Sequence, residues 1–270
     1  MTVGETCSAR EPPHPTPRSV RLFELDFDVS TQAGLLDRIG QAIRAKQSLW
    51  LVTVNVHTLC LAHRDSHFLA TIRRADIRTA DGMPIVWLSG LRGSRLRERV
   101  TGSDLLRPLA DRAAREGWSL FLCGGGPSVA DRLADALKAH APGIQIVGTA
   151  SPTIPDDQVS IDAPEGVKAL EAIRAASPDI LLVALGQPKQ ESWIAQLRAA
   201  GDLPGVVVGV GASFDFLTGL QRRAPSWMRR AGLEWVHRIS TQPARLGPRY
   251  VRDALTFARL CVTEWTRPRD

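Results

Sequence analysis

Short apolar runs alternate with longer stretches of helical periodicity along most of the chain. The runs that predict strands span residues 49–55, 118–123, 144–148, 179–185 and 205–210. They are nearly continuous in apolar residues, as in strands that are covered on both faces. The stretches that predict helices span residues 57–74, 104–116, 128–139, 165–176 and 189–199. Residues 85–91 are apolar, but their pattern does not distinguish a strand from a helix.

Strands that alternate with helices of this length predict parallel βαβ units. We therefore expect an α/β fold, a Rossmann-like parallel-sheet sandwich, over residues 18–220. The proline-rich residues 1–17 are expected to be a disordered or extended leader. Residues 221–270 form a separate, arginine-rich C-terminal appendage, expected to be helical.

The segments that follow the predicted strands are rich in polar residues and glycine. In an open parallel sheet the ligand lies beyond the carboxyl ends of the strands, so these segments are expected to converge on one cleft. They contain Thr53 with Asn55, Gly124 to Gly126, Gly186 to Glu191, and Gly209 to Asp215. Asp81 with Gly82, in a loop that follows residues 75–80, is expected to join them.

Three consecutive glycines, Gly124, Gly125 and Gly126, lie between a strand and a helix. Backbone N–H groups there can approach a diphosphate at the positive end of the helix. A dinucleotide fingerprint would need a third glycine where Val129 stands and an acid after the strand of residues 144–148, which has none. A nucleotide diphosphate is thus favoured over NAD, with tight-turn packing as the alternative.

Asp81 is the carboxylate that we select as general base. It lies in a loop without an adjacent basic residue, and a base needs only to lie within hydrogen-bond reach of the hydroxyl that it deprotonates. The alternative is that Asp81 and Gly82 simply form a turn.

Three further polar residues are candidates for ligand binding. Gln187 and Gln190 flank the start of a helix, where their amides would bind sugar hydroxyls or merely face solvent. Asp215 lies between two phenylalanines and needs a partner. It would hold a ligand hydroxyl or tie down its own loop.

No metal site is expected from the sequence. His63 and His67 are spaced i, i+4, but no further ligand completes a set, so we expect a solvated helix face. Asp26 and Asp28 lie in an alternating strand, would point to one face, and are interpreted as structural.

The positive charge is concentrated in the C-terminal appendage. The chain has a formal charge of +6, whereas residues 221–270 contain eleven arginines, no lysines and four acidic residues, a net charge of +7. Arginine grips phosphate with two parallel hydrogen bonds and tryptophan prefers the membrane boundary. The segment therefore indicates a polyphosphate group held at a membrane surface. The alternative is compositional bias, because 30 of the 34 basic residues are arginine.

The compartment is expected to be the cytosol. The four cysteines show no paired spacing, which argues against a disulfide framework. The N-terminus lacks a secretory pattern. The apolar runs are far shorter than the ~20 residues that cross a bilayer.

Together these segments resemble the WecG/TagA/CpsF family of bacterial glycosyltransferases. The matching segments are Thr53-Val-Asn55, Ala80-Asp-Gly82, Arg99-Val-Thr-Gly-Ser-Asp104, Leu122-Cys-Gly-Gly-Gly126, Ala184-Leu-Gly-Gln-Pro-Lys-Gln-Glu191, Val210-Gly-Ala-Ser-Phe-Asp-Phe-Leu-Thr-Gly219, Arg223-Ala-Pro225, Gly232-Leu-Glu-Trp235, Pro243-Ala-Arg and Arg249-Tyr250. They cover about residues 20 to 255 in order.

The resemblance implies an inverting transfer of a hexose-type sugar from a UDP-sugar to a saccharide on a polyprenyl diphosphate, at the cytoplasmic face of the membrane. It implies no cofactor and no metal. By resemblance Asp81 is the catalytic base, while Thr53 and Asn55 line the sugar pocket. Arg99 and Gln190 fall in the same site, and Asp215 binds sugar or nucleotide.

The resemblance also makes the appendage a membrane-targeting lid, in which Arg238, Arg245 and Arg249 would meet the acceptor's diphosphate and anionic headgroups. Two features depart from the usual pattern of the family. Met83 and Pro84 follow Asp81 and Gly82, where many members have Asp-Gly-x-Gly, and Gln187 is a variant residue. N-acetylmannosamine, glucuronate and other hexoses therefore stay open as donor sugars, as does self-association. Two alternative functions are a nucleotide-dependent oxidoreductase on the same fold and a nucleic-acid binder that uses the basic tail.

Overall fold

The computed structural model describes residues 19–93, 95–155 and 159–267. The predicted leader, residues 1–17, lies outside these ranges. A parallel six-stranded sheet forms the centre of the molecule, in the order β4-β3-β8-β7-β5-β6. Its strands are β3 (Leu49–Val54), β4 (Ile77–Ala80), β5 (Ser119–Gly124), β6 (Gln145–Ala150), β7 (Ile180–Ala184) and β8 (Val206–Gly209). The Rossmann-like α/β prediction is confirmed.

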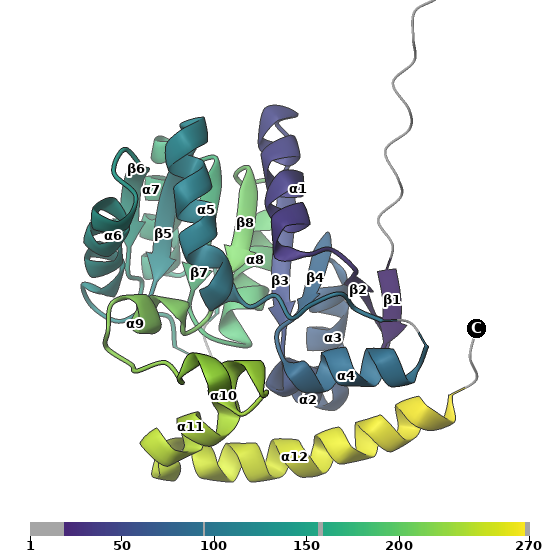
Figure 1. Cartoon of the computed structure of the whole chain (residues 1–270). Helices are drawn as coiled ribbons and strands as arrows, with labels where there is room; N and C mark the ends of the chain where they lie inside the picture. Colours follow the sequence, from purple (N-terminus) through teal and green to yellow (C-terminus); the bar gives the residue numbers. More distant parts are fainter. Residues whose placement is uncertain (1–18, 94, 156–158, 268–270) are drawn as a thin grey trace, which may run out of the picture.

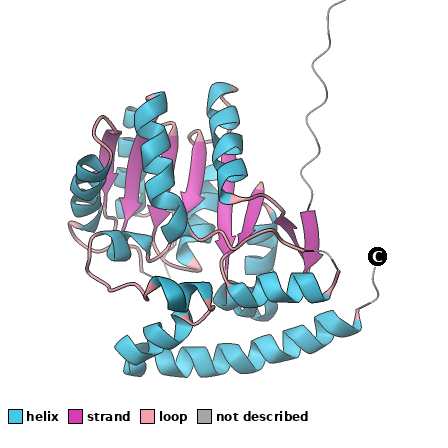
Figure 2. Ribbon diagram, in the orientation of Figure 1, coloured by secondary structure: helices cyan, strands magenta, loops and turns pink. Residues whose placement is uncertain are grey.

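Helices cover both faces of this sheet (Figure 2). One face packs against α1 (Gln32–Arg44), α5 (Gly102–Glu116) and α6 (Val129–His140). The other packs against α2 (Val56–Arg64), α3 (Ser66–Arg73), α7 (Pro164–Ala176) and α8 (Lys189–Ala199). Successive strand residues serve alternate faces, so Trp50 and Val52 join one core and Leu51 the other. This two-sided burial explains the continuous apolar runs.

An antiparallel hairpin precedes the sheet. It consists of β1 (Ser19–Leu22) and β2 (Leu25–Asp28). Asp26 pairs with Arg21 and Asp28 with Arg38, so both acids of the Asp-x-Asp sequence have structural partners. The structural interpretation of these acids is confirmed.

The predicted helix of residues 57–74 is wrong as a single element. It breaks at Asp65, whose carboxylate accepts hydrogen bonds from the backbone N–H groups of His67 and Phe68 and so caps α3. His63 ends one helix and His67 begins the next, so they do not share a helix face. The ambiguous run around residues 85–91 is helical and forms α4 (Met83–Leu91).

The last part of the chain lies across the carboxyl ends of the strands. After α9 (Ser213–Leu217) come α10 (Ser226–Arg230), α11 (Glu234–Thr241) and α12 (Pro243–Thr266). Figure 1 shows these helices on the side toward which the arrowheads of the sheet point. In the described part of the chain, no helix is both long and apolar enough to cross a bilayer.

Two buried acids attach α12 to the body of the protein. Asp253 lies 2.6 Å from His57 Nδ1 on α2, and Glu264 accepts a hydrogen bond from the backbone N–H of Phe23 in the β1–β2 turn. Arg64 adds an ion pair to Asp253. The opposite face of α12 exposes Val251, Leu255, Val262 and Trp265 together with Arg252 and Arg259.

Candidate functional site

Asp81 immediately follows β4, and its backbone N–H donates to the carbonyl of Val54 at the end of β3. No described residue makes a hydrogen bond or ion pair with its carboxylate. Part of the residue reaches solvent, but protein atoms surround the carboxyl group. This burial raises the pKa of Asp81 to about 6, with Arg99 opposing the shift. Asp81 is thus a carboxyl group that changes charge close to neutral pH.

Arg99 belongs to an ion-pair network beside Asp81. Its guanidinium lies 3.1 Å from Asp104 on α5 and 3.1 Å from Glu234 on α11. Arg223 and Arg229 also pair with Asp104, at 2.7 and 3.0 Å. The network therefore joins the appendage to the sheet domain next to the candidate base.

Sequence reasoning did not identify Asp104, Glu234 or Arg223 as partners of Arg99. All of them lie in segments that carried the family resemblance. The available signal for these pairs was that different segments of the family match contain residues of opposite charge. Which charge pairs with which depends on the fold, so the sequence did not reveal it.

Thr53 and Asn55 lie at the end of β3, as predicted. Thr53 is buried. Asn55 caps α2, because its side-chain oxygen accepts from the backbone N–H of Thr58 while the Thr58 hydroxyl accepts from the Asn55 N–H. The structure brings both residues to the edge that carries Asp81, and gives Asn55 a local structural role besides.

The glycine loop after β5 satisfies demands of packing. A Cβ on Gly124, at φ +113°, would lie 2.5 Å from the backbone of Ala184 at the end of β7. A Cβ on Gly125, at φ +75°, would lie 2.8 Å from the Val129 side chain. Gly126 has neither a positive φ nor a close neighbour. Tight-turn packing therefore explains two of the three glycines, and their diphosphate role stays a prediction.

A fully buried carboxyl group, Glu191, links three loops at the carboxyl edge. Its Oε1 accepts hydrogen bonds from Gln187 at 3.1 Å and from Gln190 at 2.9 Å. Gln187 accepts from Thr58 in α2, and Gln190 accepts from the Gly211 N–H after β8. Burial raises the pKa of Glu191 to about 7, and its Oε2 has no partner.

The two glutamines proposed as sugar ligands thus hold loops together. Both amide atoms of Gln190 bind protein groups and the residue is almost completely buried. Gly186, at φ +78°, begins this loop and a Cβ there would meet no atom within 4 Å. No pattern in the sequence indicates that Glu191 is their common partner.

Asp215 accepts a hydrogen bond from Gln221 Nε2 at 2.7 Å. This contact fits the loop-tying alternative, and Asp215 still lies at the edge of interest, on α9. The three lid arginines differ in their surroundings. Arg238 lies over the Phe216 ring and Arg249 over the Tyr250 ring, each at 5.5 Å, whereas Arg245 is exposed.

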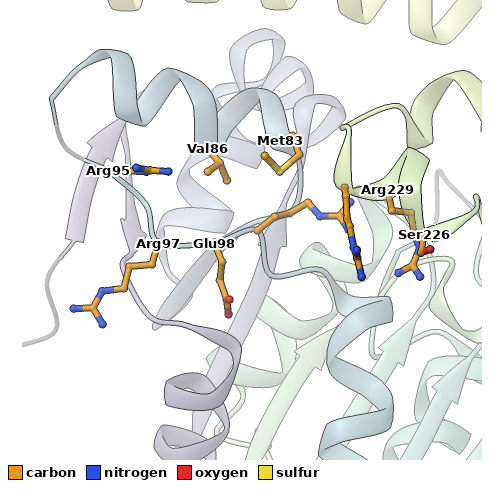
Figure 3. Close-up of a pocket in the computed structure, with 9 residues that line it drawn as sticks. Met83, Val86, Arg95, Arg97, Glu98, Ser226 and Arg229 are labelled. Carbon is orange, nitrogen blue, oxygen red and sulfur yellow. The ribbon is translucent and has the colours of Figure 1, made fainter.

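A cavity of about 460 Å³, which we call the arginine pocket, is lined by Met83, two residues after Asp81, and by Arg99, whose charge acts on Asp81. Figure 3 shows it between α4, the loop that follows α4, and α10. Its charged lining consists of Arg95, Arg97, Glu98, Arg99, Arg229 and Arg230. Apart from Arg99, none of these residues was selected from the sequence. No three His, Cys, Asp or Glu side chains among the described residues gather closely enough to hold a metal ion.

Comparison with known proteins places this geometry in a family. A protein of Bacillus spizizenii (strain ATCC 23059 / NRRL B-14472 / W23), named N-acetylglucosaminyldiphosphoundecaprenol N-acetyl-beta-D-mannosaminyltransferase, is 33% identical over 242 residues, 87% of this chain and 90% of that protein. A Bacillus subtilis (strain 168) protein of the same name is 31% identical over 193 residues, 72% of each. The model of the Glycosyl transferase WecG/TagA/CpsF family matches residues 20–270. The chain therefore belongs to the WecG/TagA/CpsF family of glycosyltransferases, as its motifs predicted.

Proposed function

We propose that this glycosyltransferase moves a hexose-type sugar from a UDP-sugar to a saccharide linked through diphosphate to a polyprenol. The observation that carries the proposal is Asp81 at the carboxyl edge of the sheet, a carboxyl group that no described residue hydrogen-bonds or pairs with, and whose pKa burial raises to about 6. The names of the two Bacillus relatives support a polyprenyl-diphosphate-linked acceptor.

In this proposal ionised Asp81 removes the proton from the acceptor hydroxyl. The acceptor oxygen attacks the anomeric carbon from the face opposite UDP, the bond from that carbon to the UDP oxygen breaks, and UDP leaves with the electron pair. The anomeric configuration inverts. Because negative charge develops on the diphosphate, nearby cationic groups and backbone N–H groups would stabilise the transition state. The loop of Gly124 to Gly126 is our candidate, and Arg99 is proposed to bind substrate beside Asp81.

Thr53, Asn55, Gln187, Gln190 and Asp215 are proposed to shape the donor site. For the glutamines and Asp215 the contacts described above support positioning of loops as well as direct binding. We propose no cofactor and no required metal. The names of the relatives favour N-acetylmannosamine as the sugar, and glucuronate or another hexose is the alternative.

We further propose that the protein binds the inner face of the plasma membrane through its C-terminal helices. The outer face of α12 carries exposed apolar residues flanked by arginines, a pattern that suits the interface of an anionic bilayer. Arg245 and Arg249 would meet headgroup phosphates there. An exopolysaccharide or a related cell-surface glycan would be the product.

The test uses the purified full-length chain, a panel of UDP-sugars and a polyprenyl-diphosphate-linked N-acetylglucosamine acceptor. We expect one UDP-sugar to yield an elongated lipid-linked product together with free UDP, both detected by mass spectrometry. The panel includes UDP-glucose and UDP-N-acetylglucosamine, whose sugars differ from N-acetylmannosamine only at carbon 2. The absence of product with every donor would contradict the proposal.

A further inference from the structure

The arginine pocket contains positive charge that the protein does not neutralise. Among the described residues, Arg95, Arg97 and Arg230 have no ion pair. Arg99 and Arg229 share Asp104, and the Nε of Arg229 is buried without a hydrogen bond. Glu98 is the one acid among the described residues that line the pocket, and it already accepts a hydrogen bond from the backbone N–H of Gln32.

Arg95, Arg97 and Arg230 are exposed, so water and salt screen their mutual repulsion, and an anion bound between them would lower it further. The planar guanidinium matches phosphate oxygens with paired hydrogen bonds. The volume of about 460 Å³ exceeds what a single phosphate requires. These features together fit an extended polyphosphate group.

The position of the pocket relative to Asp81 identifies which polyphosphate. Asp81 follows β4, the edge strand, and the pocket extends from there along α4 and α10. The glycine-rich loops follow β5 and β7, on the far side of β3 and β8. Asp81 therefore lies between the arginine pocket and the glycine-rich loops, which both suit phosphate. The proposed reaction brings two diphosphates to Asp81, one on the donor and one on the acceptor.

The surroundings of the pocket suit a lipid. Trp87 and Leu91 on α4 and Trp227 on α10 are each at least half exposed. Tryptophan is enriched where protein meets the membrane interface. An apolar chain leaving the pocket would therefore meet apolar side chains and the bilayer surface.

From these observations we infer that the arginine pocket holds the diphosphate of the lipid-linked acceptor, leaving the glycine-rich loops to the diphosphate of the donor. The identity of this ligand rests on the proposed function. The inference moves the acceptor's diphosphate away from Arg238, Arg245 and Arg249. Arg238 instead packs on Phe216 of α9.

A binding experiment tests this without requiring turnover. Phosphatidylcholine vesicles containing a polyprenyl diphosphate are compared with vesicles of equal surface charge made with phosphatidylglycerol. The first variant combines Arg95→Ala with Arg230→Ala, and the second carries Arg97→Ala alone. Arg115→Ala/Lys138→Ala, two exposed positions outside the pocket, is the charge-matched control. UDP affinity is measured for each by calorimetry.

We expect the wild-type protein to prefer the diphosphate vesicles. The Arg95→Ala/Arg230→Ala variant should lose ~10-fold or more of this preference, since a hydrogen bond to a charged group contributes about 1.5–3 kcal/mol. UDP affinity and the control should be unchanged. Equal binding to both vesicle types, an unaffected double variant, or a loss of UDP affinity instead would overturn the inference. Failure of every donor in the transfer assay would contradict the proposed function alone.

Discussion

Asp81 and Asp253 are both enclosed at the boundary between the sheet domain and the C-terminal helices, but their surroundings are opposite. Asp253 lies 2.6 Å from His57 Nδ1, pairs with Arg64, and its carbonyl accepts from the Cys60 thiol. No described residue hydrogen-bonds to the Asp81 carboxylate, and burial raises its pKa to about 6. Burying a carboxylate is unfavourable unless partners compensate it.

The comparison separates an anchor from a reactive group. With its charge compensated, Asp253 holds α12 against α2. The Asp81 carboxylate lacks such hydrogen-bond partners among the described residues, so it binds a proton near neutral pH, as the proposed general base would. An anchoring acid and the proposed general base thus lie at the same boundary, and their partners distinguish them.

The largest expected effect is on catalysis by Asp81→Asn. The amide keeps the shape but cannot accept a proton, so sugar transfer should fall by ~10²–10⁴-fold. UDP affinity and the circular dichroism spectrum should stay as in the wild type, and Asp135→Asn on α6, which is exposed, is the control. Transfer that persists within about tenfold would place the base elsewhere.

The second prediction concerns the anchor. Asp253→Ala leaves His57 and Arg64 without their common acid, so the free energy of unfolding should fall by about 1.5–3 kcal/mol. Proteolysis should then cleave the C-terminal helices faster than in wild type. Urea denaturation and timed digestion measure both quantities, with Asp135→Ala as control. An unchanged digestion pattern would show that this contact does not anchor α12.

Glu191→Gln is expected to give the smallest effect, and one that depends on pH. Because burial raises the folded-state pKa of Glu191 from 4.5 to about 7, the folded protein binds its proton more tightly than the unfolded chain. Wild-type stability should therefore decline as pH rises from about 4.5 through 7, and the variant should lack that part of the decline. We expect melting curves to favour the variant by of order 1 kcal/mol at pH 8 and by much less at pH 5. If the stabilities of the wild type and of Glu191→Gln depend on pH in the same way, Glu191 does not have a raised pKa in the folded protein.

The elements that depend on local pattern were predictable. The helix at residues 189–199 has the predicted limits, and the strands differ from prediction by a few residues. The break at Asp65 was missed because the surrounding residues keep helical periodicity, and one capping carboxylate outweighs it locally.

What the sequence did not reveal depends on long-range pairing. Asp81 was selected as a loop carboxylate without an adjacent basic residue, whereas β4, the strand before it, was not predicted. The network of Asp104 with Arg99, Arg223 and Arg229 was not predicted either. The arginine pocket gathers side chains that lie more than a hundred positions apart. In a chain with 30 arginines among 34 basic residues, composition alone could not indicate which of them converge.

The most direct test of the account is the pH dependence of kcat/KM for the acceptor, measured at saturating donor. With the pKa of Asp81 raised to about 6, the wild-type value should rise about tenfold per pH unit below 6 and level off above 7. The residual activity of Asp81→Asn should lack this transition. A wild-type profile that is flat from pH 5 to 8, or a transition that survives in Asp81→Asn, would contradict the assignment of Asp81 as the base.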